Sequence, residues 1–335
     1  MKVSIVGCGS ISSAHIGAIS KISDARIISV ADCIPERARA AADRTGARAF
    51  TSLESLLRDK KPDVLHICTP HYLHVPMACA AMEQGVSVLC EKPCAMTAEQ
   101  LTELRAVQRR TGSAFGVCFQ NRYNRSSLFL KSLIAGGEYG ALKGMRAIVT
   151  WRRDADYYES GDWRGKLATE GGGVLINQAI HTLDLMNWLG GGISAVTAHV
   201  SNDHLKGVIE VEDTVSALVE FRQGFRGVFY ATTAHAVTSP VILEASFEDK
   251  TFRIEGDTVF EIDGGITPVS LPSDDEIFGK VCWGRGHTAL ISDFYDCLSS
   301  GRPFEIDAFE GGKAVSLMLG IYESAKTNQR LEVEA

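Results

Sequence analysis

The sequence lacks both an excess of basic residues and any apolar run long enough for a membrane-spanning helix. Lys and Arg number 34 against 41 Asp and Glu, which gives a formal net charge of −7. An acidic chain has no electrostatic footprint for nucleic acid, and a bilayer span needs about 20 apolar residues. We therefore expect neither a nucleic-acid nor a membrane partner. Met1 leads almost at once into a predicted strand, which leaves no room for a signal peptide, so we expect a cytoplasmic location.

Cysteine is present but is not arranged for metal or disulfide chemistry. The nine cysteines are spread singly, and no Cys-x-x-Cys pair occurs. Cys90 and Cys94 lie close together, but no second pair or nearby histidine completes a zinc set. We expect reduced, mostly buried cysteines and predict no metal site.

The first third of the chain alternates between strand and helix patterns. The predicted strands are 3–6, 25–31, 64–68, 86–90 and 115–119. The predicted helices are 13–22, 35–45, 53–59, 74–84 and 97–111. Strands that alternate with helices predict βαβ units and a parallel sheet.

After residue 121 the predicted strands become long and consecutive. They are 142–151, 193–200, 213–221, 226–232, 241–247, 252–255 and 259–262. Helices are predicted at 126–135, 174–189, 287–299 and 308–327. This pattern indicates an antiparallel or mixed sheet, and we divide the chain into domains 1–121 and 122–335.

A glycine turn, Gly7-Cys8-Gly9-Ser10-Ile11-Ser12, follows the first predicted strand and precedes a helix. The first glycine permits a tight turn and the second lets the backbone approach a pyrophosphate, which the helix N-terminus can bind. Asp32 ends the second strand, where a carboxylate accepts bonds from ribose hydroxyls and repels a 2′-phosphate. We therefore predict an NAD site. Arg37 leaves NADP open as a less favoured cofactor, and Asp32 could instead cap the next helix.

The tripeptide Glu91-Lys92-Pro93 follows the strand 86–90. Proline ends the strand, so the lysine is expected at the carboxyl end of the sheet, where ligands bind in open parallel sheets. A surface lysine at a strand exit is the alternative.

Four motifs together resemble the Gfo/Idh/MocA oxidoreductases, named for glucose-fructose oxidoreductase and inositol dehydrogenase. They are the glycine turn, Thr69-Pro70-x-x-x-His74, Glu91-Lys92-Pro93 and the segment 170–184 with its glycine triplet. The resemblance covers essentially the whole chain. It implies a Rossmann domain and a C-terminal domain on a large, open, mostly antiparallel sheet that binds substrate and makes a homodimer or homotetramer. It also implies hydride transfer between a nicotinamide and a carbinol or carbonyl carbon of a sugar, cyclitol or sugar derivative.

The resemblance assigns catalysis to Lys92 and His181. Histidine, with a reference pKa of ~6.5, suits removal of a hydroxyl proton near neutral pH, and an ammonium stabilises a developing alkoxide. Position 177, often Asp in the family, is Asn here. Asn177 lies four residues before His181 on a predicted helix and is expected on the same face.

The remaining candidates are taken from the ends of predicted strands and from an aromatic and arginine-rich loop at 151–164. Aromatic rings cover the C–H faces of sugars while charged groups bond hydroxyls; a subunit contact is the alternative for this loop. The expected cofactor-binding residues are Gly7, Gly9, Ser10, Ile11, Asp32, Thr69, Pro70, His71, His74, Glu91, Lys92 and Gln120. The expected substrate-binding residues are Lys92, Arg122, Tyr123, Trp151, Arg153, Tyr157, Tyr158, Trp163, Arg164, Asn177, His181 and His287.

Two rival functions remain open at this stage. One is a glycoside-cleaving or epimerising enzyme that oxidises a sugar transiently with bound NAD, for which Tyr157, Tyr158 or His287 could supply an extra base. The other is a regulator that only senses NAD(H).

Overall fold

The computed structural model describes residues 1–59, 61–271 and 286–334, which form two compact units. The N-terminal unit comprises the described parts of 1–123 together with 286–312. The C-terminal unit comprises 124–271 and 313–334. The N-terminal unit thus takes in a segment that lies within the predicted domain 122–335. Among the described residues, no helix combines the length and the apolar character needed to span a membrane.

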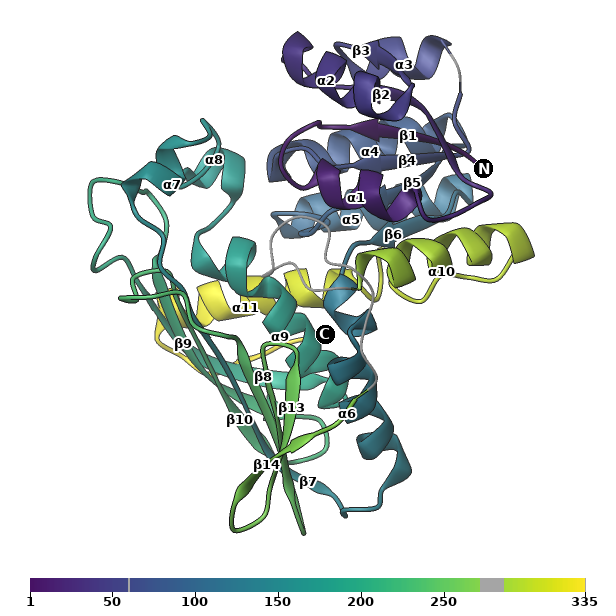
Figure 1. The fold of residues 1–335 in the computed structure, drawn as a ribbon. Coiled ribbons are helices and arrows are strands. Elements are labelled where there is room, and N and C mark those ends of the chain that lie inside the picture. The colour runs from purple at the N-terminus through teal and green to yellow at the C-terminus, as the bar shows by residue number, and fades with distance from the viewer. Residues whose placement is uncertain (60, 272–285, 335) are drawn as a thin grey trace. The chain divides into compact units, whose positions relative to one another are not determined.

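The N-terminal unit is built on a six-stranded parallel sheet with the order β3-β2-β1-β4-β5-β6 (Figure 1). The strands are β1 (Lys2–Val6), β2 (Arg26–Ala31), β3 (Arg48–Phe50), β4 (Val64–Ile67), β5 (Ser87–Cys90) and β6 (Phe115–Val117). The order reverses between β1 and β4, and nucleotides bind at such a switch point beyond the carboxyl ends of the strands. This is the predicted Rossmann architecture.

The helices that connect these strands are α1 (Ser12–Ile19), α2 (Pro35–Thr45), α3 (Leu53–Asp59), α4 (His74–Glu83) and α5 (Ala98–Thr111). A further helix of this unit, α10 (His287–Ser300), comes from the later segment. The sequence explains several of their ends. Pro35 occupies the first turn of α2 and Gly46 closes it with a φ of 67°. Two short 3₁₀ turns, η1 (His71–Leu73) and η2 (Gln120–Tyr123), follow β4 and β6.

The C-terminal unit is built on a nine-stranded, mostly antiparallel sheet with the order β14-β13-β12-β11-β7-β10-β9-β8-β15 (Figure 1). Only β7 and β10 pair in parallel among the pairings described. The strands are β7 (Leu142–Thr150), β8 (Ile193–Ser201), β9 (Thr214–Phe221), β10 (Arg226–Thr232), β11 (Ile242–Phe247), β12 (Thr251–Glu255), β13 (Thr258–Ile262), β14 (Ile266–Val269) and β15 (Leu331–Glu332). The predicted fold class is therefore confirmed for both units.

One face of this sheet is buried and the other is partly exposed. The strands alternate accordingly, as in β10, where Val228 and Tyr230 are exposed while Phe229 and Ala231 are buried. The helices of this unit are α6 (Arg125–Gly136), α7 (Ala155–Glu159), α8 (Leu167–Glu170), α9 (Ile180–Leu189) and α11 (Gly312–Thr327). Of these, α9 packs on β7 and α6 packs on α9 and β12.

Two predicted helices differ from the structure at their starts. The predicted helix 174–189 begins as a π-helical turn, η3 (Leu175–Ala179), which continues into α9. Such turns are uncommon and often occur at functional sites. The predicted helix 308–327 begins at Gly312.

Candidate functional site

The glycine turn after β1 has the geometry of a dinucleotide cradle. Gly7 adopts a φ of 87°, and a Cβ there would lie 2.6 Å from the backbone carbon and oxygen of Cys68, so a side chain does not fit. A Cβ on Gly9 would meet nothing within 4 Å. The backbone is therefore tightly packed at the first glycine and open at the second, which fits the approach of a pyrophosphate. Ser10 and Ile11 complete the turn before α1.

Asp32 holds this turn in place. Its side chain is 8% exposed. One carboxylate oxygen accepts a hydrogen bond from the Cys8 N–H at 2.7 Å, and the other accepts from the Ile34 N–H at 2.8 Å. Each oxygen has a further lone pair for a ribose hydroxyl. Ile34 occupies the N-cap position of α2, and the Asp32 carboxylate bonds its N–H, so Asp32 also fixes the start of that helix.

His74 ties two of the predicted motifs together. Its ring is buried, with Nδ1 2.7 Å from the carbonyl oxygen of Pro93 and Nε2 2.9 Å from that of Thr69. Burial lowers the pKa of His74. The imidazole thus fixes the loop after β4, which includes Pro70 and His71, against the loop after β5.

Thr69 leaves a polar atom available at this edge of the sheet. Its hydroxyl oxygen is buried and has no hydrogen-bond partner in the part of the chain that the structure describes. A ligand at the carboxyl end of β4 could satisfy it. Together with Gly7, Gly9 and Asp32, it fits the binding of NAD.

Glu91 and Lys92 follow β5, as predicted. Glu91 is buried, and its Oε1 lies 2.9 Å from His15 Nε2. Burial alone would raise the pKa of Glu91, but the bond from His15 and nearby positive charge hold that pKa well below its usual range. Lys92 is only partly buried, and its peptide bond to Pro93 is cis. A buried carboxylate therefore anchors the residue next to Lys92.

The residues that follow β6 mainly contact other residues of the N-terminal unit. Gln120 is buried. Arg122 is also buried and lies 3.0 Å from a carboxylate oxygen of Glu310. The Tyr123 hydroxyl donates to Asp293 at 2.6 Å. These bonds give Arg122 and Tyr123 a structural role, and their predicted contact with substrate stays a prediction.

The glycine triplet after α8 has a packing reason. A Cβ on Gly172 would lie 2.1 Å from the Tyr322 hydroxyl, and one on Gly173 would lie 1.8 Å from the Glu212 carbonyl oxygen. The Glu212 carboxylate accepts from the Gly173 N–H at 2.9 Å and from the Leu175 N–H at 3.0 Å. The triplet therefore lets the start of η3 approach Glu212 closely.

Asn177 and His181 follow this start. The Asn177 amide donates to the carboxylate of Glu170, which also accepts from the Gly165 N–H and is 1% exposed. His181 is partly exposed in the first turn of α9. A buried carboxylate, that of Glu170 seven residues earlier, is thus bonded to the Asn177 amide. Glu170 lies within the motif 170–184, but nothing in that motif alone assigns it a role.

The loop 151–164 stacks arginines on aromatic rings. The Arg153 guanidinium carbon lies 5.0 Å from the ring centroid of Trp151 and 5.1 Å from that of Tyr157. The Arg164 guanidinium lies 4.9 Å from the Tyr157 ring and 5.0 Å from the Trp163 ring. Each guanidinium also donates a hydrogen bond, Arg153 to the Arg152 carbonyl at 2.7 Å and Arg164 to the Ser160 hydroxyl at 3.1 Å. A guanidinium has five N–H donors, so others remain for oxygen acceptors while the face is stacked. We call Trp151, Arg153, Tyr157, Trp163 and Arg164 the aromatic–arginine cluster.

Tyr158 does not share this environment. It is buried in a small core with Leu205, Ile209 and Val211, and its hydroxyl lies 3.3 Å from that of Thr233. Burial raises its pKa. The predicted contact with substrate and the suggested role as a base are therefore corrected to a packing role.

His287 begins α10 and lies in the N-terminal unit, 3% exposed. Its Nε2 is 4.0 Å from Glu91 Oε1. Burial lowers its pKa to about 4. It is therefore a buried neighbour of Glu91, together with His15, which the sequence analysis did not single out.

Comparisons with known proteins agree with this architecture. Residues 1–119 match the model of an oxidoreductase family with an NAD-binding Rossmann fold, and residues 128–258 match the Gfo/Idh/MocA C-terminal domain. The chain is 26% identical to the D-glucoside 3-dehydrogenase of Escherichia coli (strain K12), over 99% of this chain and 97% of that protein. It is 26% identical to the levoglucosan dehydrogenase of Pseudarthrobacter phenanthrenivorans, over 91% and 88% of the two chains. The crystal structure of the WlbA dehydrogenase from Bordetella pertussis, in complex with NADH and UDP-GlcNAcA, superimposes with a TM-score of 0.89 at 30% identity, covering 100% and 98% of the chains.

Proposed function

The chain belongs to the Gfo/Idh/MocA oxidoreductase family and is an NAD-dependent dehydrogenase, and from this premise we propose that it oxidises a secondary hydroxyl of a sugar, cyclitol or sugar derivative. The reverse reduction is the same chemistry. The observation that carries the proposal lies within one unit: the Gly7–Asp32 cradle and Lys92 occupy the carboxyl edge of the same parallel sheet.

Lys92 and His181 are the proposed reacting groups. NAD, when bound, accepts the hydride. Loss of the hydride and the hydroxyl proton leaves a carbonyl, so the protein must accept the proton and stabilise the negative charge that develops on oxygen. The Lys92 ammonium is suited to stabilising that charge. The His181 imidazole is suited to accepting the proton, because histidine is a common general base near neutral pH.

Glu170 and Asn177 are proposed to position this chemistry. Asn177 is neutral, but its amide is held by a buried carboxylate. The amide oxygen of Asn177 is thereby oriented away from Glu170, because the nitrogen makes the bond. An oriented amide supplies a fixed dipole without adding a second charge beside His181.

We propose that the aromatic–arginine cluster binds the substrate. Rings cover the apolar faces of a sugar, and the remaining N–H groups of Arg153 and Arg164 suit hydroxyl or carboxylate oxygens. A sugar derivative with a negative charge is therefore favoured within the substrate class. NAD is the proposed cofactor over NADP because the Asp32 carboxylate repels a 2′-phosphate.

We further propose that the protein is a homodimer or homotetramer in the cytoplasm, where free NAD is available. Leu218 and Val228 pair directly across β9 and β10, and both are exposed together with Tyr230. Exposed apolar side chains on one sheet face favour association with a second copy. Light scattering during size-exclusion chromatography tests this. If the Val228→Lys variant keeps the oligomeric mass of the wild type, the subunit contact does not lie on this face of β9 and β10.

The experiment that tests the function is a screen of neutral sugars, uronic acids and cyclitols with NAD and with NADP. We expect net formation of NADH with at least one of them. Turnover of a glycoside or epimerisation without net NADH would favour transient oxidation instead. Tight NADH binding with no turnover of any compound would favour a sensor.

A further inference from the structure

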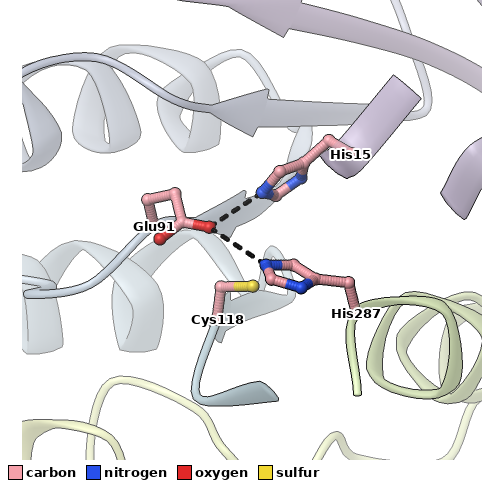
Figure 2. Close-up of side chains that lie close together, drawn as sticks. All are labelled: His15, Glu91, Cys118 and His287. Carbon is pink, nitrogen blue, oxygen red and sulfur yellow. Dashed lines mark hydrogen bonds and ion pairs between the residues drawn. The ribbon is translucent and has the colours of Figure 1, made fainter. Parts of the chain in front are cut away.

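Four potential metal-ligating side chains converge in the interior of the N-terminal unit. They come from α1 (His15), the end of β5 (Glu91), the end of β6 (Cys118) and the first residue of α10 (His287). Figure 2 shows Glu91 Oε1 between the two imidazoles, with the Cys118 sulfur beside them. One ligand atom from each residue lies within 4.8 Å of all the others, and all four side chains are buried.

His287 points to a missing ligand. Its Nε2 has no hydrogen-bond partner among the described residues, although the side chain is 3% exposed. The nearest carboxylate oxygen, Glu91 Oε1, is 4.0 Å away, too far for a hydrogen bond. A buried polar nitrogen without a partner costs about 1–3 kcal/mol, and a cation between His287 and Glu91 would satisfy both.

A second layer of residues supports His15. Its Nδ1 lies 2.7 Å from His66 Nδ1, and His66 Nε2 lies 2.7 Å from the Tyr295 hydroxyl. With the proton on Nδ1, His15 donates to His66 and presents the lone pair of Nε2 to the cluster. Metal-bound histidines are commonly held by such a bond from the other ring nitrogen.

The geometry and the donor set point to zinc. We propose that His15, Glu91, Cys118 and His287 form a closed, four-coordinate Zn²⁺ site. Two imidazole nitrogens, a thiolate and a carboxylate oxygen suit Zn²⁺ and do not suit Mg²⁺ or Ca²⁺. The Zn–ligand lengths set ligand–ligand edges of about 3.3–3.8 Å. The His15–Glu91 separation of 2.9 Å must widen and the His287–Glu91 separation of 4.0 Å must shorten.

Charge balance suits a buried site. Binding replaces the proton of the Cys118 thiol, which leaves to solvent, by a sulfur–zinc bond. The two positive charges of Zn²⁺ then meet one carboxylate and one thiolate, so the site is neutral overall. With four protein ligands it has no open position for substrate, so its role is structural. It would join α10 to α1 and to the strand ends next to Lys92. This inference does not depend on the proposed substrate.

The test is a metal titration of the full-length protein. Protein prepared without chelator is expected to carry about one zinc per chain by mass spectrometry of its metals. After removal of zinc, Co²⁺ should bind one-to-one and give the visible absorption of a tetrahedral site with a thiolate-to-cobalt band. Cys118→Ala should lose the thiolate band, and His287→Ala should lose tight binding of the metal.

The matched control is Cys90→Ala, which changes a buried cysteine outside the cluster. It should keep both the thiolate band and tight metal binding. His66→Leu removes the partner of His15 and should weaken binding by roughly 10–100-fold while keeping the bands.

The wild-type titration decides the matter even if a variant fails to fold. Substoichiometric zinc together with no tetrahedral cobalt spectrum would overturn the proposal, and the cluster would then be a hydrogen-bonded group only. A thiolate band that persists in Cys118→Ala would equally overturn it.

Discussion

The side-chain amide of Asn177 donates a hydrogen bond to the buried carboxylate of Glu170. Position 177 is therefore not simply a place where a carboxylate has been lost. The negative charge lies one hydrogen bond further from the helix that carries His181. An aspartate at 177 would face Glu170 directly, which changes what this substitution is expected to do.

Asn177→Asp should destabilise the protein by roughly 1–3 kcal/mol near neutral pH, because a partly exposed carboxylate would oppose the buried Glu170 carboxylate without a donor. The pair would keep a proton, so its folded-state pKa is raised above the unfolded value. The folded variant then binds more protons than the unfolded chain. Its free energy of unfolding therefore falls as the pH rises above the pKa of an ordinary carboxyl group. The free energies of unfolding of variant and wild type, measured with urea, should therefore become similar at acidic pH.

The double variant Asn177→Asp/Glu170→Gln is the control for this prediction. It reverses the direction of the hydrogen bond and should recover most of the lost stability. Equal losses in the single and double variants would show that residues 170 and 177 are not coupled.

Lys92→Ala should keep NADH binding but lower kcat by about 10²–10³-fold, as expected when one group that stabilises a developing oxyanion is removed. Lys92→Arg should not rescue it, because a planar guanidinium does not replace a compact ammonium. Lys61→Ala, an exposed lysine of the same unit, is the control. Near-normal turnover of either Lys92 variant at saturating substrate would remove Lys92 from the reaction.

Asp32→Ser should lower NAD affinity about tenfold or more, through the loss of bonds to a charged acceptor. Because Asp32 also holds the Cys8 and Ile34 N–H groups, part of the loss will be structural. The ratio of kcat/KM for NAD to that for NADP cancels this shared part and should fall. A wild-type enzyme that prefers NADP would contradict the assignment.

Gly173→Ala should lower the free energy of unfolding by about 3 kcal/mol or more, because the added Cβ would lie 1.8 Å from the Glu212 backbone oxygen, which cannot move away. Gly136→Ala is the matched control. That glycine ends α6, a Cβ there meets nothing within 4 Å, and the change should be neutral or slightly stabilising. Denaturant midpoints of both variants check the difference, and similar midpoints would contradict the packing explanation.

Tyr158→Phe should leave kcat/KM unchanged. It should lower the free energy of unfolding by only about 1 kcal/mol, because it removes one long hydrogen bond from a packed side chain. A collapse of activity in this variant would instead make Tyr158 a reacting group and would favour the reading of transient sugar oxidation.

Helices and strands whose ends are marked by local sequence signals could be predicted from the sequence. Pro35 and Gly46 marked both ends of α2, and Pro93 marked the exit of β5. The sequence prediction missed β3, β14 and β15, which are short and lie at sheet edges; β14 even contains Pro268, which edge strands tolerate. Short edge strands lack the buried pattern that identifies a strand.

The candidate site was predicted only where a motif is contiguous. The glycine turn and Glu91-Lys92 required no tertiary information. The Glu170–Asn177 bond depends on a turn at Gly171 and on a π-helical turn that spacing does not reveal. The meeting of His15, Glu91, Cys118 and His287 depends on where α10 packs, for which no local pattern exists. Tyr158 was misassigned because an aromatic loop residue has the same sequence signature whether it faces solvent or packs inward.

The central claim is that the protein transfers a hydride from a sugar-like carbinol to NAD as a net reaction. The most direct measurement uses a turned-over substrate with deuterium at the oxidised carbon and mass spectrometry of the nicotinamide product. We expect one deuterium in each reduced nicotinamide formed, with the reaction abolished in His181→Ala. Deuterium that stays in the sugar, with turnover but no reduced nicotinamide, would contradict it.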